Sequence, residues 1–139
     1  MPTPNVRILR TAIALIAATV ATLVLPPASA HHSYAGYDRC KSFTITGKIE
    51  RISWSNPHVV FTVKIDDSRS YLVQWLDPQR LAHFGLTSNS LKLGDRVEVT
   101  GSKNRDPNVR ILTLITAVQR PADGWQWTLP APITADCRG

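Results

Sequence analysis

Apolar and polar side chains alternate one by one over several short segments, and this pattern most limits how the chain can fold. In the segment 43–49, Phe43, Ile45 and Ile49 occupy alternate positions, and Gly47 fills the remaining position of the same phase. A period of two residues is typical of a strand with one buried face. The chain is therefore expected to be mainly β, and the glycine permits a sharp bend in the first strand.

The alternation changes phase after this segment. Ile52 and Trp54 fall on positions of the opposite phase. One extra residue in one strand of a pair produces such a change. We therefore predict a β-bulge near Arg51.

Four more segments show the strand pattern, and a short helix is indicated between the third and fourth strands. Asp77 can cap that helix, Pro78 suits its first position, and Gly85 can end it. The further strands are expected at 59–65, 71–75, 96–101 and 109–118. This order predicts an OB-like, five-stranded Greek-key barrel with one short helix between strands three and four. An open sandwich of the same strands is the alternative.

The first thirty residues have the order of a secretory signal. Arg7 and Arg10 precede an uncharged run over 11–25, and small residues fill positions 28–30. The run is shorter than the ~20 apolar residues that a membrane span needs. We expect cleavage after Ala30, a periplasmic or secreted product, and no membrane span after cleavage. An uncleaved membrane anchor is the alternative.

These features divide the chain into a signal peptide at 1–30, an N-terminal tail at 31–42, the barrel at 43–120 and a C-terminal tail at 121–139. Cys40 and Cys137, the two cysteines of the sequence, lie in the two tails. An isolated pair of cysteines in an oxidising compartment is typical of a disulfide. We therefore predict a Cys40–Cys137 bond that tethers the tails. The chain-entropy model gives a loop of this length about 4–5 kcal/mol of stabilisation.

Charge and motifs exclude several classes of function. The formal net charge is +6, but the basic residues are scattered and form no block of the kind that binds nucleic acid. The sequence has no G-x-S-x-G elbow, no H-E-x-x-H pair and no glycine-rich phosphate loop. We therefore expect neither a nucleic-acid partner nor an enzymatic activity.

Three pieces of sequence carry a resemblance to a known family. They are His31-His32-Ser33 with Tyr37-Asp38, the segment Trp54-Ser55-Asn56-Pro57-His58, and the segment Gly94-Asp95-Arg96-Val97-Glu98-Val99-Thr100-Gly101. In these pieces the chain resembles a family of small secreted bacterial proteins of unknown function. The resemblance implies export and an OB-like barrel, and it brings no activity or ligand with it.

Histidines near the expected new amino terminus point to a metal. Cleavage after Ala30 would give His31 a free amine beside its imidazole, and His32 adds another nitrogen. Nitrogen-rich sites suit Cu(II), and His58 is a natural further ligand at the start of a strand. We therefore predict that copper, or a related metal, binds to His31, His32 and His58. The alternative is that the two N-terminal histidines belong to a mobile tail and that His58 simply ends a turn.

A second hypothesis needs no metal. OB barrels bind oligosaccharides or oligonucleotides on the face of their second and third strands and on the adjoining loops. Trp54 can stack on a sugar and Arg51 can meet an anionic group, with Asn56 in the loop between them and the next strand. On this hypothesis the barrel is a module that binds an envelope glycan or protein through these three residues. Trp75 lies on the inward phase and is expected in the core.

Overall fold

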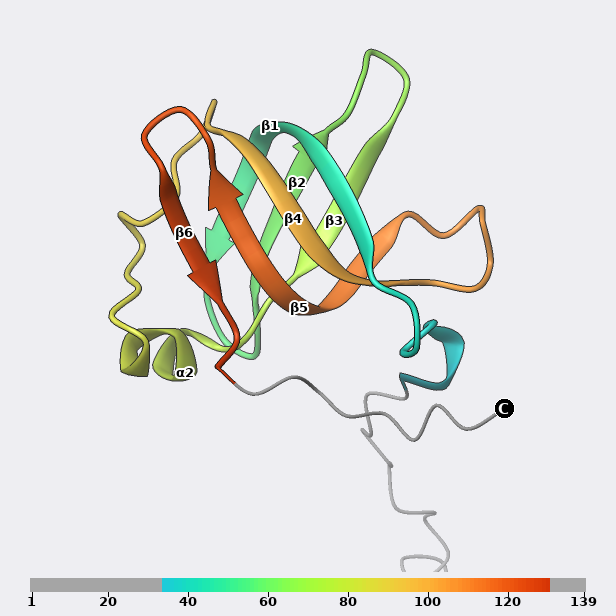
Figure 1. Cartoon of the computed structure of the whole chain (residues 1–139), viewed down its shortest axis with the longest axis horizontal. Coiled ribbons are helices and arrows are strands. Elements are labelled where there is room, and N and C mark those ends of the chain that lie inside the picture. Colours follow the sequence, from blue (N-terminus) through green and yellow to red (C-terminus); the bar gives the residue numbers. More distant parts are fainter. Residues whose placement is uncertain (1–33, 131–139) are drawn as a thin grey trace, which may run out of the picture. The chain divides into compact units, whose positions relative to one another are not determined.

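Five strands close into a barrel in the computed structural model, which describes residues 34–130 (Figure 1). Strand β1 pairs with β2 on one side and with β4 on the other, and β4 in turn pairs with β5. Strand β3 pairs with β2 and, in parallel, with β5. The elements are η1 (Tyr34–Gly36), β1 (Phe43–Trp54), β2 (Val59–Lys64), β3 (Ser70–Gln74), α2 (Pro78–His83), β4 (Arg96–Lys103), β5 (Ile111–Arg120) and β6 (Trp125–Thr128).

The parallel contact between β3 and β5 closes the barrel. It consists of the pairs Leu72–Ile111 and Val73–Leu112. The resulting order β1-β2-β3-β5-β4, with α2 between β3 and β4, confirms the predicted mainly β, OB-like barrel with one short helix. An open sandwich would lack this contact.

The first strand is long and bent, and it pairs with two partner strands. Its register with β2 shifts between Ile49 and Arg51, which confirms the predicted bulge. Gly47 lies earlier on the same strand, where a Cβ atom would overlap the carbonyl oxygen of Lys64. Only glycine lets β2 approach β1 so closely at this point.

The signals predicted for the helix are present at both of its ends. The Asp77 carboxylate accepts the backbone N–H of Arg80 at 2.9 Å, Pro78 is the first helical residue, and Gly85 has a φ of 75°. Leu81, a residue of this helix, is fully buried. No helix within residues 34–130 combines the length and the hydropathy needed to cross a membrane.

A sixth strand, β6, lies within the segment predicted as a C-terminal tail. It pairs antiparallel with β5, with Trp127 opposite Val118 and Trp125 opposite Arg120. Four residues are too few for a period of two to stand out in a sequence, so the strand is set by its pairing with β5. Trp127 is 6% exposed and joins the core.

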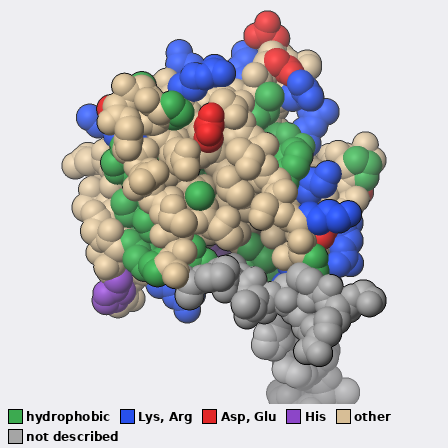
Figure 2. Space-filling model, in the orientation of Figure 1, with side chains coloured by type: hydrophobic (Ala, Val, Ile, Leu, Met, Phe, Trp, Pro, Cys, Tyr) green, Lys and Arg blue, Asp and Glu red, His purple; other side chains and the backbone are tan. Residues whose placement is uncertain are grey.

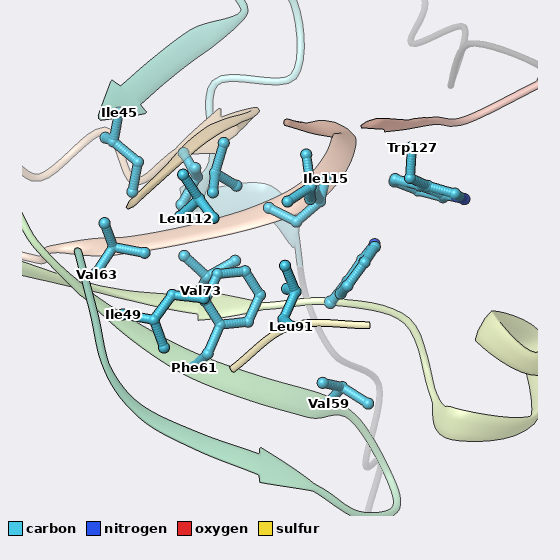
Figure 3. Packing of buried hydrophobic residues seen from close by; sticks show 14 of the residues in the cluster. Ile45, Ile49, Val59, Phe61, Val63, Val73, Leu91, Leu112, Ile115 and Trp127 are labelled. Carbon is cyan, nitrogen blue, oxygen red and sulfur yellow. The ribbon is translucent and has the colours of Figure 1, made fainter. Parts of the chain in front are cut away.

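The core changes in character along the barrel (Figure 3). Ile45, Ile49, Val63 and Val97 are buried aliphatic side chains at one end, and we call these four residues the aliphatic end. Half-buried Tyr71 lies opposite Val63 and packs beside them. The other end contains tryptophan side chains, and Trp127 lies there. The predicted core role of Trp75 is confirmed, since it is 3% exposed.

Candidate functional site

His58 is the one predicted metal ligand among the described residues. It is half-buried, directly precedes β2, and follows a cis peptide bond between Asn56 and Pro57. His31 and His32 lie outside the described residues. The predicted three-histidine site is therefore represented in the structure by its barrel residue alone.

Backbone hydrogen bonds fix the position of His58. The N–H of the next residue, Val59, donates to the carbonyl of Leu76 at 3.0 Å, and the carbonyl of Val59 accepts the N–H of Trp75 at 2.8 Å. Val59 is itself fully buried. These two bonds attach the base of the β1–β2 loop to the segment that follows β3, which gives the imidazole a rigid support.

The N-terminal segment reaches the same part of the barrel. Tyr34 lines a small cavity of about 50 Å³ together with Trp75 and Leu76, the two residues that bond to Val59. The other lining residues are Gln74, Thr113, Leu114, Ile115 and Leu129. The first described residue of the chain thus packs beside the strand end that carries His58.

Five aromatic rings surround this end of the barrel. Trp75 is at the centre, with ring centroids 6.5 Å from Trp54, 6.1 Å from Phe61 and 5.0 Å from Trp127. Phe84, at the end of α2, packs on Trp127 at 5.8 Å. All four pairs are edge-to-face, an arrangement that aromatic quadrupoles favour. We call these five residues the aromatic cluster.

The aromatic cluster contains polar atoms that the core does not satisfy. The indole Nε1 atoms of Trp75 and Trp127 are buried and have no hydrogen-bond partner among residues 34–130. A buried donor without a partner costs roughly 1–3 kcal/mol. This end of the barrel therefore gives up stability that the aliphatic end does not.

The residues of the metal-free hypothesis do not form one surface. Arg51 is exposed and lies opposite Thr62 of β2 on the outside of the barrel. Trp54 lies opposite buried Val59 and is half-buried against Trp75, which places it on the other face of β1. Asn56 is exposed in the loop. Arg51 and Trp54 cannot both contact a ligand that lies on one face of this strand.

A family model decides where the chain is placed among known proteins. Residues 18–113 match the model of a family described as Family of unknown function (DUF6152). The chain belongs to this family. A comparison with curated proteins finds no match. The three pieces that carried the resemblance all lie inside the matched range, and the DUF6152 description adds no ligand or activity to them.

Other side chains of the described DUF6152 barrel do not add ligands around His58. Within residues 34–130, no group of three or more His, Cys, Asp or Glu residues is placed so as to hold a metal ion. The carboxylate of Asp66 accepts Ser68 N–H and Arg69 Nε–H at 3.0 and 2.6 Å, and these bonds hold the pKa of Asp66 well below its usual value. Asp66 therefore stabilises the β2–β3 hairpin. The predicted partner of Cys40, Cys137, lies outside the described residues, so their bond stays a prediction.

Proposed function

We propose that this DUF6152 protein is an exported OB-like barrel that binds a copper ion with His31, His32 and His58, and that it binds rather than catalyses. The observation that carries the proposal is the shared cavity of Tyr34, Trp75 and Leu76. Tyr34, which follows His31 and His32 in the chain, lies there beside residues that hydrogen-bond to Val59, the first residue of β2, which His58 directly precedes.

Chain length then gives the reach. Tyr34 is three positions after His31, and three residues of extended chain span about 10 Å. Leu76 contacts the same cavity as Tyr34 and is bonded to the residue after His58. The amine and imidazole of His31, the imidazole of His32 and that of His58 supply a nitrogen-rich set, which suits Cu(II).

The proposal includes export and a disulfide. Signal cleavage after Ala30 creates the amine that copper needs, and a Cys40–Cys137 bond holds the N-terminal tail to the domain in an oxidising compartment. Mass spectrometry of the secreted protein, with and without reductant, checks both. The expected product starts at His31 and contains no free thiol.

Copper titration of the mature protein against two histidine variants tests the site. The substitution His58→Ala is expected to weaken copper binding at least tenfold, which is about 1.4 kcal/mol. His83→Ala is the matched control, because His83 is an exposed histidine on α2, and it should leave the affinity within twofold of wild type. Equal affinities for wild type and His58→Ala would reduce the site to the tail and refute the proposal.

A glycan-binding role on the outer face of β1, β2 and β3 is the second candidate. Its support is the register, which aligns Arg51, Thr62 and Leu72 in one row across the three strands. Thr62 and Leu72 are half-buried, and Arg51 is exposed. Titration with soluble envelope glycans should shift the amide resonances of this row, and Arg51→Ala should abolish the shifts. Unchanged resonances would exclude this role.

A further inference from the structure

A second cavity lies on the side of the barrel wall and is independent of the proposed copper site. It has a volume of about 130 Å³. It is lined by Arg39, Cys40, Lys41 and Ser42 of the N-terminal segment and by Ser102, Leu114 and Thr116 of β4 and β5. Leu114 is the one lining residue that it shares with the cavity beside Tyr34.

The cavity lies where the pairing of β4 and β5 is interrupted. Thr100 is opposite Ala117, whereas Ser102 is opposite Thr113, so three residues of β5 bulge out across from Gly101. A Cβ atom at Gly101 would lie 2.6 Å from the carbonyl oxygen of Thr113. The wall is therefore built to hold this irregular segment rather than a regular ladder.

The bulged segment is also strained. Leu114 has a φ of 49°, in the left-handed region that a bulky side chain rarely adopts. Such strain costs about 1–3 kcal/mol and is concentrated at functional sites. β-Bulges occur preferentially beside such sites as well. The irregularity of β5 thus marks this cavity out from the rest of the wall.

The polar lining of the cavity offers donors and positive charge. Arg39 and Lys41 are exposed at its rim, and neither forms an ion pair with a described carboxylate. Hydroxyl groups come from Ser42 and the 7% exposed Ser102, whereas the Thr116 hydroxyl donates to the carbonyl of Thr100 at 3.4 Å. No carboxylate belongs to the lining. Figure 2 shows Lys and Arg side chains along one side of the molecule and others elsewhere on the same face.

The nearest carboxylate in the sequence is directed to the backbone. Asp38 Oδ1 accepts the N–H of Cys40 at 3.3 Å. Through this bond Asp38 supports the segment that carries Arg39 and Lys41. Positive charge and hydroxyl donors therefore face the cavity without a competing acid in its lining.

We propose that this cavity binds the phosphate group of a small ligand or of a lipid headgroup. Arginine and lysine make charge-assisted hydrogen bonds to phosphate oxygens, and the guanidinium of Arg39 can contact two of them at once. The hydroxyls of Ser42 and Ser102 can donate to the remaining oxygens. The cavity holds about four water volumes at ~30 Å³ each, which suits one tetrahedral oxyanion.

The first experiment titrates inorganic phosphate into the mature protein at low ionic strength and monitors the backbone amide resonances. Phosphate should shift the resonances of Ser102 and Thr116. The double variant Arg39→Gln/Lys41→Gln should weaken binding at least tenfold, and the near-isosteric Ser102→Ala about threefold or more. Near-ultraviolet circular dichroism checks that each variant keeps the wild-type fold.

A second double variant separates a built site from net charge. Lys48 of β1 lies opposite Arg96 of β4, and neither lines this cavity. Lys48→Gln/Arg96→Gln removes the same charge and should change phosphate affinity by less than twofold. Equal losses in the two double variants, or no shift at Ser102, would overturn the proposal.

Vesicles distinguish the two sources of phosphate. A lipid headgroup is identified if the protein binds phosphatidylglycerol vesicles, inorganic phosphate displaces it from them, and the Arg39→Gln/Lys41→Gln variant no longer binds. Binding of inorganic phosphate without vesicle binding identifies a free ligand. Failure of both overturns the proposal and leaves the copper site untouched, because no residue of that site is changed.

Discussion

The two ends of the barrel differ in what fills them. The four residues of the aliphatic end are buried and aliphatic, with half-buried Tyr71 opposite Val63, and Gly47 brings β1 and β2 into close contact there. The aromatic cluster leaves two indole N–H groups without partners among the described residues and keeps Phe84 40% exposed. His58 and the cavity beside Tyr34 belong to this second end. We therefore expect the aliphatic end to contribute more to stability than the end that carries the proposed copper site.

The largest expected effect tests the aliphatic end. Gly47→Val should lower the free energy of unfolding by at least about 3 kcal/mol, because the new side chain overlaps the backbone of Lys64. Denaturant unfolding measures the loss. Gly124→Ala is the control: its φ is 73°, and apart from its chain neighbours no atom of the described residues lies within 4 Å of the added Cβ, so the cost should be only about 1–2 kcal/mol. Similar losses in the two variants would mean that β1 and β2 are not held this closely.

A medium effect tests the aromatic cluster. Trp127→Phe should change the free energy of unfolding by less than about 1 kcal/mol, because removing an unpaired donor offsets the lost packing. Phe61→Leu, in the same cluster, removes no polar atom and should cost about 1–2 kcal/mol. A Trp127→Phe loss larger than the Phe61→Leu loss would show that the indole N–H is satisfied in solution.

Sequence patterns predicted the local features of both ends. They missed the contacts between distant segments, except for the barrel closure that the OB-like order of the elements implies. The bulge after Ile49 and the caps of α2 follow from phase and residue type, which are local properties. Strand β6 was not predicted because only pairing with β5 gives Trp125 and Trp127 their positions. The parallel pairing of β3 with β5 is also non-local, and it follows only from the OB-like order of the elements.

The two candidate sites show the same limit. Sequence reasoning selected His58 correctly as a residue at a strand start, but no pattern places Tyr34 beside Leu76. The phosphate cavity was missed because the pattern over 109–118 predicts a strand and gives no sign of the bulge across from Gly101. Thr116, which lines this cavity and lies within the predicted strand, was the polar signal that was available. A left-handed leucine leaves no trace in the sequence.

The smallest expected effect concerns the helix beside the aromatic cluster. The backbone N–H of Arg80 lowers the pKa of Asp77 by hydrogen bonding to its charged form. This contribution to stability is complete above the unfolded-state pKa and is lost as pH falls through the lower folded-state pKa, which is below about pH 4. In Asp77→Asn, whose cap does not titrate, the unfolding midpoint should depend less on pH in that range. Identical pH profiles would contradict this role of Asp77.

Paramagnetic broadening by Cu(II) tests the central claim most directly, because it shows which end of the barrel the metal approaches. Substoichiometric Cu(II) added to the mature protein should weaken the amide resonances of Val59 and Leu76 and leave those of Val63 and Val97 intact. The account predicts that His58→Ala restores the intensity at Val59. Broadening that stays confined to residues before Tyr37, with Val59 unaffected in wild type, would contradict a metal site built on the barrel.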